Sequence, residues 1–289
     1  MEFLTLLIVL GLVQLWGSGA PLQEDGWFRS WGKIITGLLG PGPTRLLLIV
    51  LPPVAALLFL QALFESLLFG LLSLALFVVV LLYCLGRGDF NVSIQRYLAA
   101  WSEGDFEAAY DKALGIGDFS QSDAINDHLS LHDHVRVAII YDGYQRWFAA
   151  VFWFLVLGPC GALGYRLSYL CARSDDMVDA DRQLALRFVH YLDWIPARLL
   201  AIAFALTGNF VQGFNRCGQR LLDNMPIPEL LDQCALAAIS SDREQQARPT
   251  DWEHFVSFGR EEIGAVQGLL NRSVICWLIV VALLALAGA

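Results

Sequence analysis

The chain has 289 residues, of which 56% are hydrophobic and only 16% are charged, and its mean hydropathy is +0.54. Soluble globular domains carry about 25% charged residues, so this composition predicts a membrane protein. The net charge of −9 argues against a nucleic-acid-binding protein, because phosphate binding needs a basic surface.

Six cysteines are spread along the chain without any Cys-x-x-Cys pair. Cys84, Cys160 and Cys276 stand in apolar runs. We interpret the six as small apolar packing residues rather than as a metal site or a disulfide framework.

The N-terminal stretch "MEFLTLLIVLGLVQLWGSGAP" resembles a signal peptide only superficially. Glu2 stands where a positive charge is expected, and Pro21 would follow the best cleavage site, Ala20. The stretch is also short for a straight helix across a membrane core of about 30 Å. We therefore expect residues 1–42 to be an N-terminal apolar or interfacial segment that forms either a retained half-span or an interfacial helix packed on the bundle.

Residues 43–85 are predicted to form a membrane hairpin. The nearly continuous apolar run from Leu46 to Leu85 fits two helices of about 20 residues better than one. The break is expected near "QALFES", where Gln61, Glu65 and Ser66 can face water.

The polar segment 86–146 is predicted to be helical. An aromatic-and-alanine pattern repeats on both sides of Gly104, which predicts a small helical hairpin. A further helix, with Ser120 or Ser122 as its N-cap, is expected to run into the third span, Trp147 to Tyr165.

The rest of the chain predicts membrane helices in 147–211 with an outer loop at 173–193, a second polar segment at 212–272, and a last span in 273–289. Within the second polar segment, a short helix is expected to begin after Pro226 or Pro228. The predicted fold class is therefore all-α: a polytopic helical membrane protein with about five spans, an N-terminal apolar half-span and small cytoplasmic helical segments.

Lysine and arginine counts predict the orientation, since they are enriched on the cytoplasmic side. Placing 86–146 and 212–272 in the cytoplasm leaves Arg173, Arg182 and Arg187 outside. The cations assigned to the cytoplasmic side are Arg29, Lys33, Arg45, Arg87, Arg96, Lys112, Arg136, Arg146, Arg216, Arg220, Arg243, Arg248, Arg260 and Arg272.

Candidate chemistry is sparse. His128 and His132 stand four residues apart and would share one helix face, but Asp127 and Asp133 project elsewhere, so a zinc site is only a weak alternative to a hydrated face. No nucleophile–base set and no phosphate loop can be identified. The sequence predicts neither a catalytic site nor a metal nor a cofactor.

The stretch "GPCGALGYR" makes one side of the third span small through Gly158, Gly161, Ala162 and Gly164. Small residues let another helix approach closely. A cavity beside Arg166 is the alternative interpretation.

The stretch "YLDWIPARL" concentrates polar groups at the start of the fourth span. Pro196 suits a first helical turn, Trp194 suits the membrane interface, and Asp193 can cap the helix. Arg198 needs a partner, because a charge at membrane depth costs roughly 3 kcal/mol or more when unpaired. It is either an interfacial anchor or part of a charged pocket shared with Arg166, and an anion or an acid from 175–181 is its expected partner.

At these residues the chain resembles a known family. "VFWFLVLGPCGALGYR" and "YLDWIPARLLAIAFAL" are similar to the AmpE family of inner-membrane proteins, which belongs with the adenosylcobinamide-phosphate synthases. The resemblance covers about residues 147–211. The scaffold positions that it keeps are Gly161, Ala162, Tyr165, Arg166, Arg187, Trp194, Pro196, Ala197 and Arg198.

The acidic motifs of the synthases are replaced in this chain. The resemblance aligns their Glu-Asn-Thr-x-Asp-Gly stretch with "YDGYQR", so Asp142 takes the place of the asparagine and Gln145 that of the aspartate. Val189 and His190 replace an Asp-Asp pair. The resemblance therefore implies the AmpE role, a membrane component linked to cell-wall stress and β-lactamase induction, rather than synthase activity.

Three functions follow as hypotheses. The first is a non-catalytic signalling protein of the bacterial inner membrane whose cytoplasmic helices meet a protein partner. The second is a transferase-like enzyme or a hydrolase descended from the synthases, acting on an anionic group or lipid head group at Arg166, Arg187 and Arg198, beside Asp193 and Trp194. The third, a transporter, has few polar residues within its spans to support it.

Overall fold

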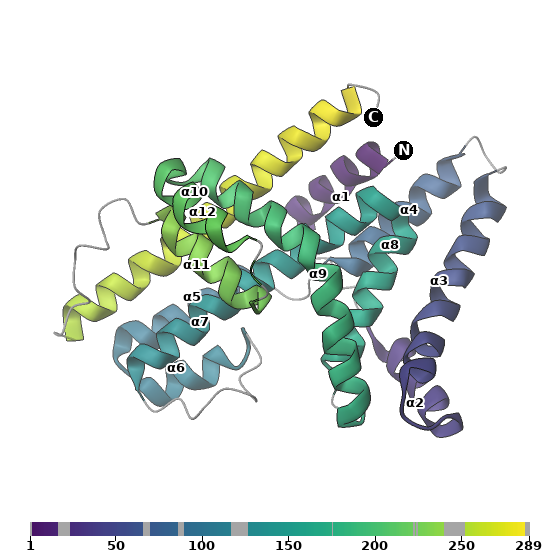
Figure 1. The fold of residues 1–289 in the computed structure, drawn as a ribbon, viewed down its shortest axis with the longest axis horizontal. Coiled ribbons are helices and arrows are strands. Elements are labelled where there is room, and N and C mark those ends of the chain that lie inside the picture. Colours follow the sequence, from purple (N-terminus) through teal and green to yellow (C-terminus); the bar gives the residue numbers. More distant parts are fainter. Residues whose placement is uncertain are drawn as a thin grey trace. The chain divides into compact units, whose positions relative to one another are not determined.

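The computed structural model describes residues 2–16, 24–65, 70–85, 90–116, 127–174, 176–221, 223, 225–239 and 252–286. All regular secondary structure of the described residues is helical, with no strand among them (Figure 1). Four helices are long and apolar enough to span a membrane, within Pro43–Phe64, His128–Ala172, Asp179–Thr207 and His254–Leu283. The all-helical membrane fold predicted from the sequence is confirmed.

The chain divides into two compact units, which are described separately. Unit 1 comprises Met1–Gly88 and Arg146–Pro196, and unit 2 comprises Asp89–Gln145 and Ala197–Ala289. The predicted N-cap residues Ser120 and Ser122 lie outside the described residues.

Unit 1 is built around α8 (Ala150–Ala172), which packs against α3 (Pro43–Glu65) and α4 (Leu71–Cys84). α1 (Glu2–Trp16) packs on α4, and α2 (Gly26–Leu38) packs on α3. The ring of Phe77 meets that of Phe154 edge-on at 6.2 Å between α4 and α8. α3 ends at Glu65, where the sequence predicts the break of the hairpin.

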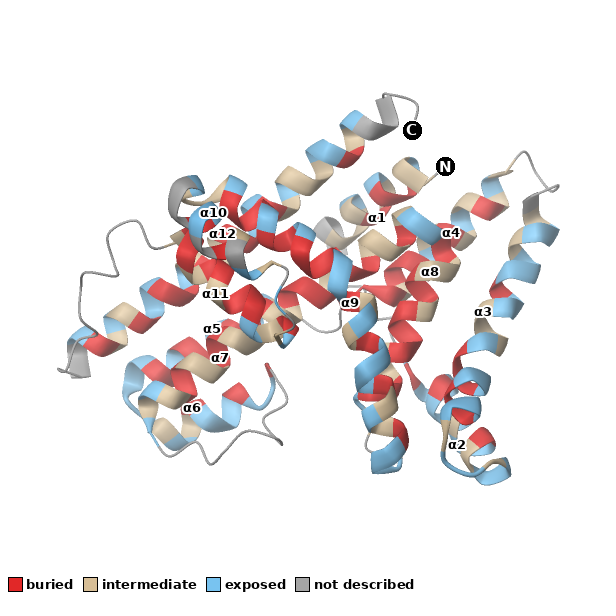
Figure 2. Cartoon of the chain, in the orientation of Figure 1, coloured by how far each residue is buried: buried red, intermediate tan, exposed pale blue. Residues whose placement is uncertain are grey.

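One side of α3 faces outward along its whole length (Figure 2). Large exposed apolar side chains of this kind contact lipid in a membrane protein. The exposed residues of α3 are Leu47, Leu48, Leu51, Leu58, Phe59, Leu60 and Leu63.

α8 breaks at Gly158. This residue has φ 66° and ψ −160°, which side-chain-bearing residues rarely adopt, and Pro159 follows it. The break brings the helix back on itself, so that a Cβ on Gly161 would lie 2.5 Å from the carbonyl oxygen of Trp153. We expected these small residues to admit another helix. Gly158 and Gly161 also allow a kink within their own helix, while a Cβ on Gly158 would lie 3.9 Å from Glu2 of α1 and one on Gly164 3.8 Å from Val54 of α3.

In unit 2, α7 (His128–Gly143) packs against α11 (Ile227–Ile239) and α12 (Trp252–Leu286). α5 (Phe90–Glu103) and α6 (Phe106–Ala113) form the predicted hairpin, with Gly104 at φ 75° between them. α10 (Phe210–Arg220) packs on α11, which begins directly after Pro226 as predicted.

The N-cap of α7 is Asp127, seven residues or fewer from the serines expected in that role. Its carboxylate accepts hydrogen bonds from the hydroxyl and the backbone N–H of Ser130, which hold the pKa of Asp127 below its ordinary value. The carboxylate is therefore charged at neutral pH, where it also suits the positive end of the helix dipole. From α7 the helix continues through η3 (Tyr144–Ala149), a π-helix, into α8, which confirms the expected continuity into the third span.

The cysteine interpretation is wrong for two of the six residues. Cys217 of α10 and Cys234 of α11 form a disulfide across the helix pair, with their Cα atoms 5.3 Å apart. The pairing depends on how α10 packs on α11, which the 17-residue separation does not reveal. Cys84, Cys160, Cys171 and Cys276 are free cysteines.

The kink gives a testable prediction on one helix. Gly161→Ala should lower the stability of the detergent-solubilised protein by about 1–3 kcal/mol, because its new methyl group collides with the backbone of Trp153. Gly164→Ala, with 3.8 Å to Val54, is the matched control and should be nearly neutral. Thermal unfolding checks both variants, and equal melting temperatures would contradict the prediction.

Candidate functional site

The predicted binding residues fall in different surroundings. Asp193 is completely buried and accepts a 2.8 Å hydrogen bond from the hydroxyl of Tyr165. Arg187 and Trp194 are exposed. Arg166 is 9% exposed, its guanidinium lies 5.6 Å from the ring of Tyr169, and its Nε has no hydrogen-bond partner among the described residues.

Asp193 is not a helix cap. α9 runs from Asp179 to Thr207, so Asp193, Trp194 and Pro196 lie inside a helix that begins fourteen residues earlier than Asp193. The outer loop predicted at 173–193 is therefore wrong from Asp179 on, because acids in the first turns of α9 give this stretch the composition of a loop. The buried carboxylate of Asp193 is held by Tyr165 of α8 instead of by backbone groups of a first turn.

Arg198 donates to backbone carbonyls after the end of α10. Its Nε donates to the carbonyl of Leu221, and its Nη2 donates to that of Asp223 at 3.1 Å. Both groups belong to unit 2. From the segment 175–181, which was expected to supply an acid, the buried Asp181 pairs with Arg45 at 2.6 Å within unit 1.

A second ion pair joins the same segments of unit 1. Lys33 of α2 lies 3.8 Å from Asp176, and Arg29 lines a pocket together with Arg173. Arg29, Lys33 and Arg45 therefore lie at the end of unit 1 that carries 173–181. We predicted these three cations to lie in the cytoplasm and 173–193 outside. That placement is wrong, because the ion pairs Lys33–Asp176 and Arg45–Asp181 bring both to the same end of unit 1.

The most elaborate polar cluster of the described chain lies in unit 2 and was not predicted. Arg136 of α7 binds both carboxylate oxygens of Asp232, with Nε–Oδ1 at 2.8 Å and Nη2–Oδ2 at 3.1 Å. Its Nη1 reaches Asp133 at 2.6 Å and Glu262 of α12 at 3.4 Å. We call Arg136, Asp133, Asp232, Glu262 and His132 the Arg136 cluster.

His132 completes this cluster and is not placed as a metal ligand. Its Nε2 lies 2.7 Å from Oε2 of Glu262, and its ring lies 5.3 Å from that of Trp101 in a tilted arrangement. Gly259 makes room, since a Cβ there would lie 3.1 Å from both rings. His128 meets the ring of Phe106 edge-on at 4.7 Å. In the described part of the chain, no three histidine, cysteine or acidic side chains are grouped to hold a metal ion.

The cluster had a weak signal in the sequence. Asp232 stands among Leu230, Leu231 and Cys234, and an acid on the apolar face of a helix requires a buried partner. The identity of the partner depends on packing, since Arg136 and Asp232 are 96 residues apart.

Gln145 occupies the position that the resemblance aligns with a synthase aspartate. It lies in the π-helix η3, is 6% exposed, and neither of its amide atoms has a hydrogen-bond partner among the described residues. A neutral amide neither accepts nor delivers a proton in general acid–base catalysis.

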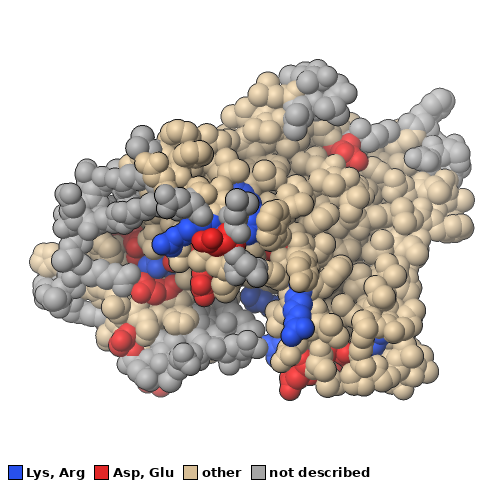
Figure 3. Space-filling view, in the orientation of Figure 1, with Lys and Arg blue, Asp and Glu red and all other residues tan. Residues whose placement is uncertain are grey.

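Charged side chains gather away from the lipid-facing helices of unit 1. In the space-filling view the surface over α3 is free of blue and red, whereas both colours appear around α2 and the first turns of α9 (Figure 3). Such a surface, with long apolar helices and charges at one end, defines a polytopic membrane protein of the helical class.

Comparison with known proteins gives the family. The model of the family described as "Regulatory signalling modulator protein AmpE" matches residues 1–289, so the chain belongs to the AmpE family. It is 26% identical to Protein AmpE of Shigella flexneri over 219 residues, 72% of this chain and 75% of that protein.

A second relative is a cobalamin biosynthesis protein. The chain is 30% identical over 158 residues to the cobalamin biosynthesis protein CobD of Chromobacterium violaceum, which covers 51% of this chain and about half, 47%, of that protein. No solved structure matches the chain.

The Arg136 cluster predicts that replacing one of its carboxylates by an amide lowers the stability of the protein strongly. Asp232→Asn should destabilise the protein by about 3–5 kcal/mol, because it leaves the buried Arg136 guanidinium without its bidentate carboxylate. Asp111→Asn removes an exposed carboxylate paired with Lys112 and should change stability by less than about 1 kcal/mol. Thermal unfolding of both variants in detergent measures the difference, and similar melting temperatures would show that the buried pair is not stabilising.

Proposed function

We propose that this chain acts as a non-catalytic regulatory component of the bacterial inner membrane, linked to the sensing of cell-wall stress and to β-lactamase induction. The membership of the AmpE family supports a regulatory role. The charged helices of unit 2 would meet a cytoplasmic protein partner.

The observation that carries the non-catalytic part of the proposal is Gln145. A transferase of the synthase type would need a carboxylate at this position, and the chain has a buried amide there. Val189 and His190 remove a second acidic pair. The CobD relative makes a transferase the competing function.

An anionic ligand fits this proposal best near Arg166. Among the residues predicted to bind it, Asp193 already accepts from Tyr165, and Arg198 already donates to two carbonyl groups. Arg166 keeps a buried guanidinium with no carboxylate partner in the described structure, which is costly in a membrane protein unless an anion compensates it.

We further propose that 86–146 and 212–272 face the cytoplasm and that 25–45 and 173–178 lie on the opposite side. α4 has 14 residues and rises about 21 Å, short of the roughly 30 Å of a bilayer core. If α4 completed a crossing, three crossings would separate Lys33 and Arg45 from Asp176 and Asp181, and the two pairs of residues would lie on opposite sides. Their ion pairs favour two crossings, through α3 and α8 alone.

The corrected cation count supports the same orientation. Eleven lysines and arginines lie in 86–146 and 212–272, against six at the end of unit 1 that carries Arg29, Lys33, Arg45, Arg173, Arg182 and Arg187. Cytoplasmic segments carry the excess of such residues.

The function is tested in two strains. Expression of the chain should restore β-lactamase induction in a host that lacks its own AmpE homologue and should not restore corrinoid synthesis to a synthase-deficient strain. Induction is read as enzyme activity and corrinoid synthesis as growth. If the chain restored growth but not induction, the regulatory function would be refuted and the transferase function supported.

The topology is tested with single introduced cysteines. Ser102→Cys in α5 and Gln183→Cys in α9 are both exposed positions, and Cys160→Ala and Cys276→Ala remove the half-exposed native thiols. In spheroplasts an impermeant maleimide should label the protein carrying Gln183→Cys, and the one carrying Ser102→Cys only after lysis. The parent with the two alanines is the blank, and labelling of both sites in intact spheroplasts would refute the orientation.

A further inference from the structure

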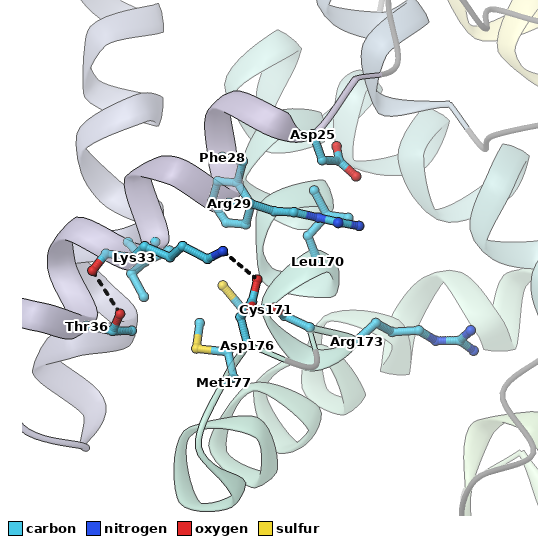
Figure 4. Close-up of a pocket in the computed structure, with 13 residues that line it drawn as sticks. Asp25, Phe28, Arg29, Lys33, Thr36, Leu170, Cys171, Arg173, Asp176 and Met177 are labelled. Carbon is cyan, nitrogen blue, oxygen red and sulfur yellow. Dashed lines mark hydrogen bonds and ion pairs between the residues drawn. The ribbon is translucent and has the colours of Figure 1, made fainter.

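A pocket of about 310 Å³ opens in unit 1 between α2 and the end of α8 (Figure 4). α2 contributes Phe28, Arg29, Lys33 and Thr36, and the segment after α8 contributes Arg173 and Asp176. Asp25, Ile49, Leu170 and Cys171 form much of the remaining wall. The pocket thus combines an apolar wall with several charged side chains.

The cationic side chains of this pocket make few strong interactions with the rest of the protein. Arg29 has no ion pair or hydrogen bond from its side chain among the described residues, and Arg173 lies over the ring of Tyr169 at 5.3 Å. Lys33 reaches toward Asp176 (Figure 4), but at 3.8 Å and with side chains 66% and 52% exposed this pair contributes little stability. An incoming anion therefore displaces few interactions.

Arg166 adds a fourth cation close to the pocket. It stands one turn before Leu170 on the same face of α8, and it interacts electrostatically with Tyr83, whose hydroxyl donates to Asp25 at 3.1 Å. Arg29, Lys33, Arg173 and Arg166 thus outnumber Asp25 and Asp176 by two charges. A phosphate group would neutralise this excess.

The faces of α2 indicate where the phosphate comes from. Phe28 and Ile35 are buried against the unit, and Arg29, Lys33 and Thr36 face the pocket at helical spacing. On a third face Trp27, Ile34 and Leu38 are 47%, 56% and 73% exposed. A helix that exposes an apolar stripe beside basic residues lies in the membrane interface, with its basic residues at the level of the head groups.

We propose that this pocket binds the phosphate of an anionic phospholipid head group, with Arg29 and Lys33 as donors. A guanidinium binds two phosphate oxygens at once, and an ammonium adds a point charge. This assignment rests on the anionic-ligand part of the proposed function and names its site and its chemistry.

The experiment measures lipid binding to the full-length protein by native mass spectrometry in detergent. Phosphatidylglycerol should bind more tightly than phosphatidylcholine. Arg29→Gln with Lys33→Gln should weaken phosphatidylglycerol binding about tenfold or more, equivalent to at least about 1.4 kcal/mol. Arg96→Gln with Lys112→Gln is the matched control: it removes one exposed arginine and one exposed lysine from unit 2 and should leave binding within about twofold.

A variant of opposite sign guards against misfolding. Asp176→Asn removes an exposed acid that competes for Lys33, so it should tighten phosphatidylglycerol binding about threefold. Unchanged binding in the Arg29 and Lys33 variant, or weaker binding with Asp176→Asn, would overturn the assignment. Displacement of the lipid by millimolar glycerol 1-phosphate would overturn the lipid as the source of the phosphate. Lipid binding and β-lactamase induction are read separately, so failure of either proposal is recognised by itself.

Discussion

The guanidinium of Arg136 on α7 forms the ion pairs that join α7 to α11 and α12 in unit 2. It uses one edge for both oxygens of Asp232 on α11 and its remaining nitrogen for Asp133 and Glu262, the latter on α12. Burying these charges is costly unless each is paired, so any arrangement of α7, α11 and α12 that separates them is strongly disfavoured. Apolar side chains alone allow neighbouring helices to slide or rotate, whereas a bidentate ion pair fixes both their register and their rotation.

The sequence predicted those features that depend on local pattern. Hydropathy gave the membrane class, Gly104 gave the hairpin of α5 and α6, and Pro226 gave the start of α11. The continuity of α7 into α8 was also expected, although the π-helix at Tyr144–Ala149 carries no local signal. The first half of α9 was missed because acids in its first turns resemble a loop, although they stabilise the start of a helix.

The candidate site was only partly predictable, for a different reason. Arg166 and Arg198 could be recognised as charges whose burial in a membrane is energetically costly. The sequence could not show which groups bind them. Arg198 binds two carbonyl groups more than twenty residues away, and Asp193 binds the hydroxyl of Tyr165. The Arg136 cluster and the Cys217–Cys234 disulfide join residues whose proximity exists only after the helices have packed.

The two units use their charges in contrasting ways. In unit 2 the Arg136 guanidinium is satisfied by three carboxylates of its own chain, so this cluster is suited to holding structure rather than to capturing a ligand. In unit 1 Arg45 is paired in the same manner, with Asp181, while Arg29, Arg173 and Arg166 have no acid partner in the described structure. Arginines kept without acids at the end of a membrane unit lose the stabilisation that Arg136 and Arg45 enjoy. An anion from outside the chain, at the level of the lipid head groups, would supply the missing stabilisation.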